Sequence, residues 1–79
     1  MNPIQSRMAR AALGLGVREL AALADVSPDT VARFERGDEL RDRTIAAMQT
    51  ALEQAGVFFV DAGDGLGVGV RLKKNFKRK

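Results

Sequence analysis

Arginine is the residue type in this 79-residue sequence whose side chain is best suited to specific recognition. A guanidinium can hold two acceptors at once, on the edge of a guanine base or on a phosphate. The sequence contains no cysteine and no histidine, which excludes the usual zinc sites, thiol chemistry and the commonest general base. It shows no nucleophile–base pair and no metal-ligand cluster. The composition therefore favours binding over catalysis, and we expect no enzyme activity, metal, cofactor or small-molecule ligand.

Two short helices, 17–24 and 28–36, are predicted around a tight turn. Ser27 can accept a hydrogen bond from the backbone N–H of Asp29 or Thr30, and Pro28 suits the first helical position. Asp25 follows the first helix, where a left-handed conformation is common and aspartate is tolerated. Apolar residues at helical spacing give each helix a face to bury: Leu20, Leu23 and Ala24, then Val31 and Phe34. Helix, short turn, helix is the pattern of a DNA-binding helix-turn-helix.

Two further helices flank this pair. The first begins at Asn2-Pro3 and runs to residue 12 or 13, where Gly14 and Gly16 end it. The other follows the loop 37–44, in which Asp42 is expected to cap the helix, and Gly56 ends it. The residues expected to face the core are Ile4, Met8, Ala11 and Leu15 in the first helix, and Ile45, Met48, Leu52 and Ala55 in the last.

Two strand-like segments, 57–60 and 68–72, are predicted to form a β-hairpin around a glycine-rich turn at Asp64-Gly65. Strand alternation places Val57 and Phe59 on one face, and Phe59 is expected to dock on the helix stripe at Leu52 and Ala55. The other face would be left exposed. An isolated hairpin is marginal in water, so a second copy is expected to cover it. The predicted dimerisation residues are Phe58, Val60, Val68 and Val70.

Residues 3 to about 56 resemble the Cro/C1-type (XRE family) helix-turn-helix regulators. The segments that carry the resemblance are Leu13-Gly14-Leu15, Glu19-Leu20-Ala21, Val26-Ser27, Thr30-Val31 and Phe34-Glu35-Arg36-Gly37. Gly16 and Val17 depart from the polar cap and glutamine that often open the first motif helix, and Asp25 replaces the usual turn glycine. The resemblance implies a small bacterial or phage protein that binds operator DNA as a homodimer.

The second motif helix would enter the major groove. Arg33 is the best candidate for base reading, because its guanidinium can hold guanine O6 and N7 together. The N-terminus of the first motif helix, with Val17 and Arg18, can face a phosphate. The resemblance further implies that Arg41 and Arg43 approach the DNA backbone or minor groove, and that Arg10 contacts phosphate. The predicted DNA-binding residues are Arg10, Val17, Arg18, Ser27, Pro28, Asp29, Thr30, Arg33, Arg36, Arg41 and Arg43.

Several of these residues have a second interpretation. Arg10 is open to a phosphate contact and, equally, to a solvated position or an ion pair with Glu35, and Arg36 is expected to meet phosphate or Glu35. Asp29 could accept from a cytosine amine, although an acid that favours the helix start is the preferred interpretation. Ser27 and Thr30 are divided between helix capping and DNA contact, and Pro28 can make only apolar contact, for example with a thymine methyl.

Charge is divided unevenly along the chain. Residues 1–72 contain eight arginines and ten acidic residues, a net charge of −2, whereas residues 73–79 add five basic residues and no acid. Every lysine lies in this tail, which is either a solvated terminus or an arm that contacts phosphates. We therefore divide the chain into a helix-turn-helix domain (1–56), a β-hairpin that dimerises (57–72) and a basic tail (73–79).

The predicted fold is mainly α, a four- to five-helix Cro/C1-like domain with a short C-terminal β-hairpin. The predicted function is sequence-specific transcription regulation, as a repressor or autoregulator that binds a palindromic double-stranded operator as a homodimer. A protein-interaction module of the antitoxin kind and an RNA-binding protein are the alternatives, the latter weakened by the scarcity of aromatic residues. No apolar run is long enough for a signal peptide or a membrane span, so a cytoplasmic protein is expected.

Overall fold

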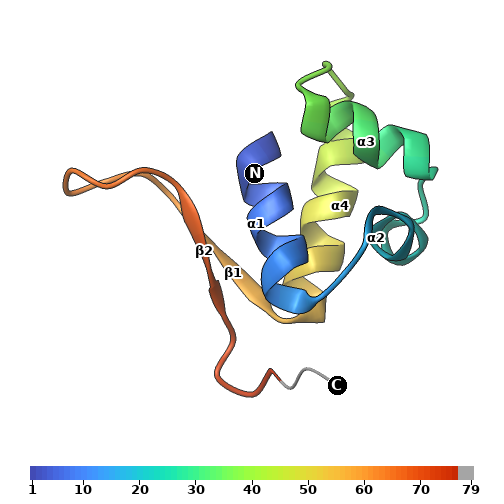
Figure 1. The fold of residues 1–79 in the computed structure, drawn as a ribbon. Coiled ribbons are helices and arrows are strands. Elements are labelled where there is room, and N and C mark those ends of the chain that lie inside the picture. Colours follow the sequence, from blue (N-terminus) through green and yellow to red (C-terminus); the bar gives the residue numbers. More distant parts are fainter. Residues whose placement is uncertain (77–79) are drawn as a thin grey trace.

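The computed structural model describes residues 1–76, which form four helices followed by a two-stranded antiparallel hairpin. The helices are α1 (Pro3–Leu13), α2 (Val17–Ala24), α3 (Pro28–Arg36) and α4 (Asp42–Ala55), and the strands are β1 (Val57–Val60) and β2 (Gly69–Leu72). α2 and α3 lie on one side of α1 and α4, and the hairpin lies on the other with its tip projecting away (Figure 1). The predicted fold is confirmed.

Three of the described helices end in the same way, with a left-handed residue that turns the chain back. This residue is a glycine after α1 and α3, and it is Asp25, with φ of 57°, after α2. The N–H groups of Asp25 and Val26 donate to the carbonyls of Ala22 and Ala21 at 3.3 and 3.0 Å. These bonds satisfy carbonyls that the helix end leaves free. The left-handed conformation predicted at Asp25 is confirmed, and it sets the tight turn before α3.

Local side chains accept hydrogen bonds from backbone N–H groups at the starts of α2 and α3. Ser27 Oγ accepts a hydrogen bond from the Thr30 N–H at 3.1 Å, as predicted for the start of α3. Gly16 has no side chain with which to cap α2. Glu19 compensates, because its Oε1 accepts a hydrogen bond from the Gly16 N–H at 2.8 Å.

The core lies where the four helices meet the first strand. Its fully buried large side chains come from α2, α3, α4 and β1: Leu20, Val31, Met48, Leu52 and Val57. Ala21 is also buried, which allows the helices around it to pack closely. In α4, Met48 and Leu52 lie in the core as predicted, while Ile45 and Ala55 are half-buried at its edge.

Three predictions about buried or capping residues are wrong. Ile4, Met8 and Ala11 of α1 are exposed, because α1 buries a face that begins with Gln5 and Ser6. Leu23 of α2 is 55% exposed, since the face that α2 buries carries Leu20, Ala21 and Ala24. Asp42 does not cap α4. Arg41 occupies the cap position and Asp42 is the first helical residue, where its charge still suits the helix dipole.

The hairpin has the predicted turn and alternation. Asp64 and Gly65 both have positive φ, 52° and 79°, as a two-residue hairpin turn requires. In the strands that the turn connects, Phe58 pairs with Arg71, and Phe59 pairs with Val70. Val57 is buried and Phe59 packs against the core, whereas Phe58 and Val60 are 58% and 40% exposed.

Two of the predicted dimerisation residues, Val68 and Val70, do not lie on the exposed face of the hairpin strands with Phe58 and Val60. Val70 is opposite Phe59 and is half-buried against the core of its own chain, on the face of the hairpin away from Phe58 and Val60. Val68 lies one residue before β2, which begins at Gly69, and it is half-buried.

Gln5 fastens the hairpin to α1. Its side-chain Oε1 accepts from the Asn2 N–H at 3.0 Å, while its own N–H donates to Asn2 Oδ1 at 2.8 Å. The Nε2 group donates to the carbonyls of Val60 and Gly69, both at 3.1 Å. A buried amide that is satisfied in this way holds the paired ends of β1 and β2 against the helix.

The chain after β2 returns to the helical body. The Lys73 N–H donates to the Gly56 carbonyl at 2.7 Å, and the Phe76 side chain packs against the core beside Gly56. Lys73 and Phe76 of the predicted tail therefore contact the helical body, while Lys74 and Asn75 are exposed, and contact of the tail with phosphates stays a prediction. The rest of the predicted tail, 77–79, lies outside the described residues. None of the helices formed by residues 1–76 is long and apolar enough to cross a membrane.

Asp25→Gly should raise the free energy of unfolding by about 0.5–1 kcal/mol, because glycine adopts the left-handed conformation without a Cβ penalty. Asp25→Ala should lower it by a similar amount. Urea denaturation of both variants measures the two effects. Shifts in the same direction would show that the backbone conformation at residue 25 does not limit stability.

Candidate nucleic-acid interface

α3 buries one face and leaves the opposite face free. Val31 and Phe34 lie in the core, three residues apart. The remaining positions of the helix are exposed or half-buried, and five of the predicted DNA-binding residues are among them: Pro28, Asp29, Thr30, Arg33 and Arg36. α3 therefore presents a polar, arginine-bearing face along its full length.

A shallow hollow runs beside this face. One wall comes from the turn and from α3, and the other from the loop after α3 and the start of α4. The residues that line it are Val26, Ser27, Thr30 and Arg33, and across from them Glu39, Leu40, Arg41 and Thr44. The structure thus brings together four of the residues predicted from the sequence to contact DNA.

Ser27 and Thr30 form hydrogen bonds with each other at the start of α3. Besides the bond from the Thr30 N–H, their hydroxyl oxygens lie 2.9 Å apart, in hydrogen-bond contact with each other. Of the two roles predicted for these residues, capping is confirmed for Ser27. Contact of either hydroxyl with DNA stays a prediction.

Arg33 and Arg36 share one carboxylate. Arg36 Nη2 lies 2.9 Å from Asp38 Oδ2, and Arg33 Nε lies 3.5 Å from the same oxygen. The expected pairing of Arg36 with Glu35 is wrong, because its partner is Asp38. Hydrogen bonding from Arg36 keeps the pKa of Asp38 below its usual value, against the opposing effect of desolvation, and the charge of Arg36 and the contact with Arg33 act in the same lowering direction. The sequence did not predict that Asp38 contacts these arginines, although a glycine between Arg36 and Asp38 at a helix end is typical of a chain that turns back toward the helix.

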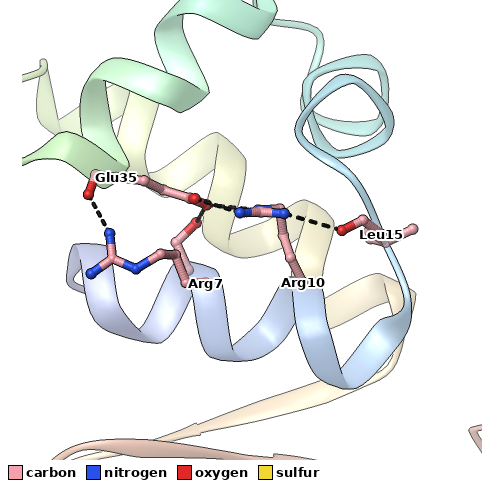
Figure 2. Close-up of polar contacts among 5 residues, drawn as sticks. Arg7, Arg10, Leu15 and Glu35 are labelled. Carbon is pink, nitrogen blue, oxygen red and sulfur yellow. Dashed lines mark hydrogen bonds and ion pairs between the residues drawn. The ribbon is translucent and has the colours of Figure 1, made fainter.

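Glu35, on the other side of α3, accepts several hydrogen bonds from α1 (Figure 2). Ser6 Oγ donates to Glu35 Oε2 at 2.6 Å. Arg10 donates through Nε to Oε2 at 2.9 Å and through Nη2 to Oε1 at 2.6 Å. Arg7 donates to the backbone carbonyl of Glu35, and the Nη1 of Arg10 donates to the Leu15 carbonyl at 3.2 Å. We call this set of residues the Glu35 cluster.

The Glu35 cluster holds an ionised carboxylate in a nearly buried position. The Glu35 side chain is only 7% exposed, and that of Arg10 is 19% exposed. Burial opposes ionisation of Glu35, but the hydrogen bonds from Arg10 and Ser6 and the charges of Arg10 and Arg7 outweigh it, so its pKa lies below the ordinary value. Hydrogen bonding to Glu35 likewise raises the pKa of Arg10, against the opposing effect of burial. The cluster fixes α3 relative to α1.

Arg10 is accordingly a structural residue. Of its two predicted roles, the ion pair with Glu35 is confirmed, and all three guanidinium nitrogens are bound within the protein. We therefore leave Arg10 out of the candidate interface. The sequence did not indicate that Ser6 donates a hydrogen bond to Glu35, because a serine in a helix is ordinarily expected to be exposed to solvent.

The remaining predicted contacts lie around α3 at the starts of neighbouring helices. Arg18 is exposed in the first turn of α2, beside a half-buried Val17 that packs against the core. Arg41 and Arg43 are exposed at the cap and in the first turn of α4. Their contact with DNA stays a prediction. Within residues 1–76 there is no group of three or more acidic residues that could hold a metal ion.

Comparison with protein families identifies one domain in the chain. A family model described as helix-turn-helix, of the Cro/C1 type, matches residues 7–59. The match covers more than half of the chain, from within α1 to within β1. A search of curated proteins gives no match.

Glu35→Gln should lower the free energy of unfolding at pH 7 by about 1–3 kcal/mol, because it leaves Arg10 half-buried without its counter-charge. The native pKa of Glu35 is lowered, so the ionised carboxylate stabilises the fold fully above its ordinary value of 4.5 and progressively less as the pH falls through the native pKa. The difference between wild type and variant should therefore shrink in acid.

Urea denaturation between pH 7 and pH 3 measures this difference. Glu39→Gln, which removes an exposed carboxylate from the loop after α3, serves as the control and should have little effect. Equal stability of Glu35→Gln and wild type at pH 7 would contradict a stabilising role for the cluster.

Proposed function

The chain belongs to the Cro/C1-type (XRE) helix-turn-helix family of DNA-binding transcriptional regulators, and we propose that it represses transcription by binding a palindromic operator as a homodimer. The observation that carries the proposal is the free polar face of α3, with Arg33 beside the hollow that Ser27, Thr30 and Arg41 also line. A helix of this kind fits the major groove. In the cytoplasm, a dimer that occupies a promoter would exclude polymerase.

Arg33 is the residue proposed to read a base. It lies midway along the exposed face of α3, and its guanidinium can donate to guanine O6 and N7 together. Pro28 and Asp29 precede it by one turn and would meet adjacent bases or the groove wall. A side chain that reads a base discriminates between sequences, whereas a phosphate contact does not.

The phosphate contacts are proposed to lie on both sides of α3. The N-terminus of α2 offers free backbone N–H groups together with Arg18, although Glu19 already occupies the Gly16 N–H. On the other side, Arg41 and Arg43 stand at the start of α4. Contacts at these two places would fix the register of α3 in the groove.

The outward face of the hairpin is proposed to form the dimer. Phe58 and Val60 are the exposed apolar residues on this face, and Val70 is left out of the proposal because it is half-buried on the opposite face of the hairpin. Charge along the hairpin is polarised, with Asp61 and Asp64 near the tip and Arg71, Lys73 and Lys74 near the root. Two hairpins packed antiparallel about a two-fold axis would place each basic root against an acidic tip.

Such a dimer would also set the spacing of the two α3 helices. A palindromic operator presents equivalent half-sites about 34 Å apart, one helical turn of DNA. The hairpin lies on the side of α1 and α4 away from α2 and α3 (Figure 1). This placement leaves the polar face of α3 available for DNA.

A protein-interaction role is the second candidate function. Phe58 is exposed beside positive charge, because Arg71 is its cross-strand partner and Lys73 Nζ lies 5.5 Å from the centre of its ring. An acidic partner protein would find both an apolar anchor and complementary charge there. Selection of duplexes from a random pool, with RNA as a competitor, separates the functions, since only an operator-binding protein enriches a palindrome.

Arg33→Ala should weaken binding to the selected operator by about 1–3 kcal/mol and binding to random DNA much less. The physical reason is that a bidentate base contact is lost only where the correct base is present. Fluorescence anisotropy on both duplexes at one salt concentration measures this. Equal losses on the two duplexes would make Arg33 a phosphate contact.

Phe58→Asp should convert the dimer to a monomer and weaken operator binding strongly, with little change in helical content. The substitution removes the apolar anchor of the proposed contact and places a hydrated carboxylate there, and both changes occur twice in the dimer. Sedimentation velocity at micromolar concentration measures the oligomeric state. Leu23→Asp is the matched control, because Leu23 is similarly exposed but lies on α2. A Phe58→Asp protein that remains dimeric places the interface elsewhere.

A further inference from the structure

Asp38 is held beside Arg33 by the backbone as well as by its side chain. α3 ends at Gly37, whose φ of 102° turns the chain back over the last helical turn. The Asp38 N–H then donates to the Arg33 carbonyl at 3.0 Å, and the Gly37 N–H donates to the Phe34 carbonyl at 3.0 Å. This arrangement fixes the backbone of Asp38 next to the last turn of α3, so that its side chain begins within reach of both arginines.

The Asp38 carboxylate contacts Arg33 at Nε and not at the two terminal nitrogens, which are the atoms that would donate to a base. Asp38 Oδ2 lies 3.5 Å from Arg33 Nε, and within residues 1–76 neither terminal nitrogen of Arg33 has a hydrogen-bond or ion-pair partner. The two terminal nitrogens can donate in parallel to guanine O6 and N7. A carboxylate on Nε therefore leaves the base-reading edge of Arg33 free and restricts its orientation.

Arg36 gives the carboxylate a second anchor. Its Nη2 lies 2.9 Å from the same Asp38 oxygen, whereas Arg33 Nε lies 3.5 Å from it. One donor of Arg36, the last residue of α3, is thereby occupied before DNA arrives. Arg33 and Arg36, the two arginines on the exposed face of α3, therefore both contact the same oxygen of Asp38.

Such a constraint has two consequences for DNA binding. An arginine loses considerable rotamer freedom when it is fixed in one geometry, so prior positioning lowers the cost of the base contact. A negative charge beside the arginines also opposes attraction to phosphates in general, which is the source of sequence-independent affinity. Both effects increase the ratio of operator affinity to random-DNA affinity.

We propose that Asp38 is a positioning residue for sequence recognition, which orients Arg33 for a guanine contact and suppresses binding to random DNA. The inference rests on the proposed function, since it requires that α3 reads an operator. It adds to that function the residue through which the protein separates specific from non-specific sites.

Asp38→Asn is the variant that tests this inference. It removes the charge with little change in shape and preserves the backbone bonds of residues 37 and 38. Glu39→Gln is the matched control, because Glu39 is the next residue and lines the same hollow. Equilibrium binding of each protein to the selected operator and to a random duplex, at the same salt concentration, gives the specificity ratio.

The expected result is that Asp38→Asn binds the operator more weakly and random DNA more tightly than wild type, with a specificity ratio lower by about tenfold. Glu39→Gln should strengthen both interactions slightly and leave the ratio unchanged. Equal shifts of the ratio in the two variants, or an unchanged ratio in Asp38→Asn, would overturn the proposal.

A double-mutant cycle separates positioning from a general structural effect. If Asp38 acts through Arg33, Asp38→Asn should cause no further loss of discrimination at the guanine position when Arg33 is already alanine. An additional loss in that background would contradict the proposal. A wild-type protein that enriches no duplex from the random pool would instead contradict the proposed function itself, so the two failures are distinguishable.

Discussion

The nearly buried carboxylate of Glu35 is the constraint on which the arrangement of the helices depends. A charge in that position is costly unless every oxygen is satisfied, and its partners, Ser6 and Arg10, lie on α1. The requirement is directional, unlike the apolar packing of Val31 and Phe34, so it selects one orientation of α3 among those that bury similar area. The free face of α3 points outward because the opposite faces of the helix are already fixed.

Acidic residues also divide the arginines into groups with different tasks. Glu35 binds Arg10 within the protein, and Asp38 restrains Arg33 and Arg36 at the surface. Other arginines, such as Arg18 and Arg41, are exposed at helix starts around α3. A body of net charge −2 over residues 1–72 can therefore still present a locally basic surface to DNA. Net charge alone would not have indicated where that surface lies.

Local features of the fold were predictable from the sequence, and long-range polar contacts were not. The bounds of α2 and α3 follow from Ser27, Pro28 and the left-handed residues, all of which act within one turn of the chain. The buried face of α1 was predicted wrongly because Gln5 and Ser6 are polar, and only their partners on the hairpin and on α3 make their burial favourable. Polarity gives no indication of a partner that lies 29 or more residues away. Of the candidate interface, Arg33 was predictable as a residue type, but Asp38 depends on the turn at Gly37.

We propose that α3, oriented by the Glu35 cluster, is the surface that meets DNA. Titration of isotope-labelled protein with the selected operator duplex, followed by the backbone amide signals in NMR spectra, tests it most directly. We predict the largest changes at residues 17–18, 27–33 and 41–43, with the signals of Ser6 and Arg10 nearly unmoved because their contacts with Glu35 persist. Changes confined to the hairpin, with the amides of α3 unaffected at saturation, would contradict the claim.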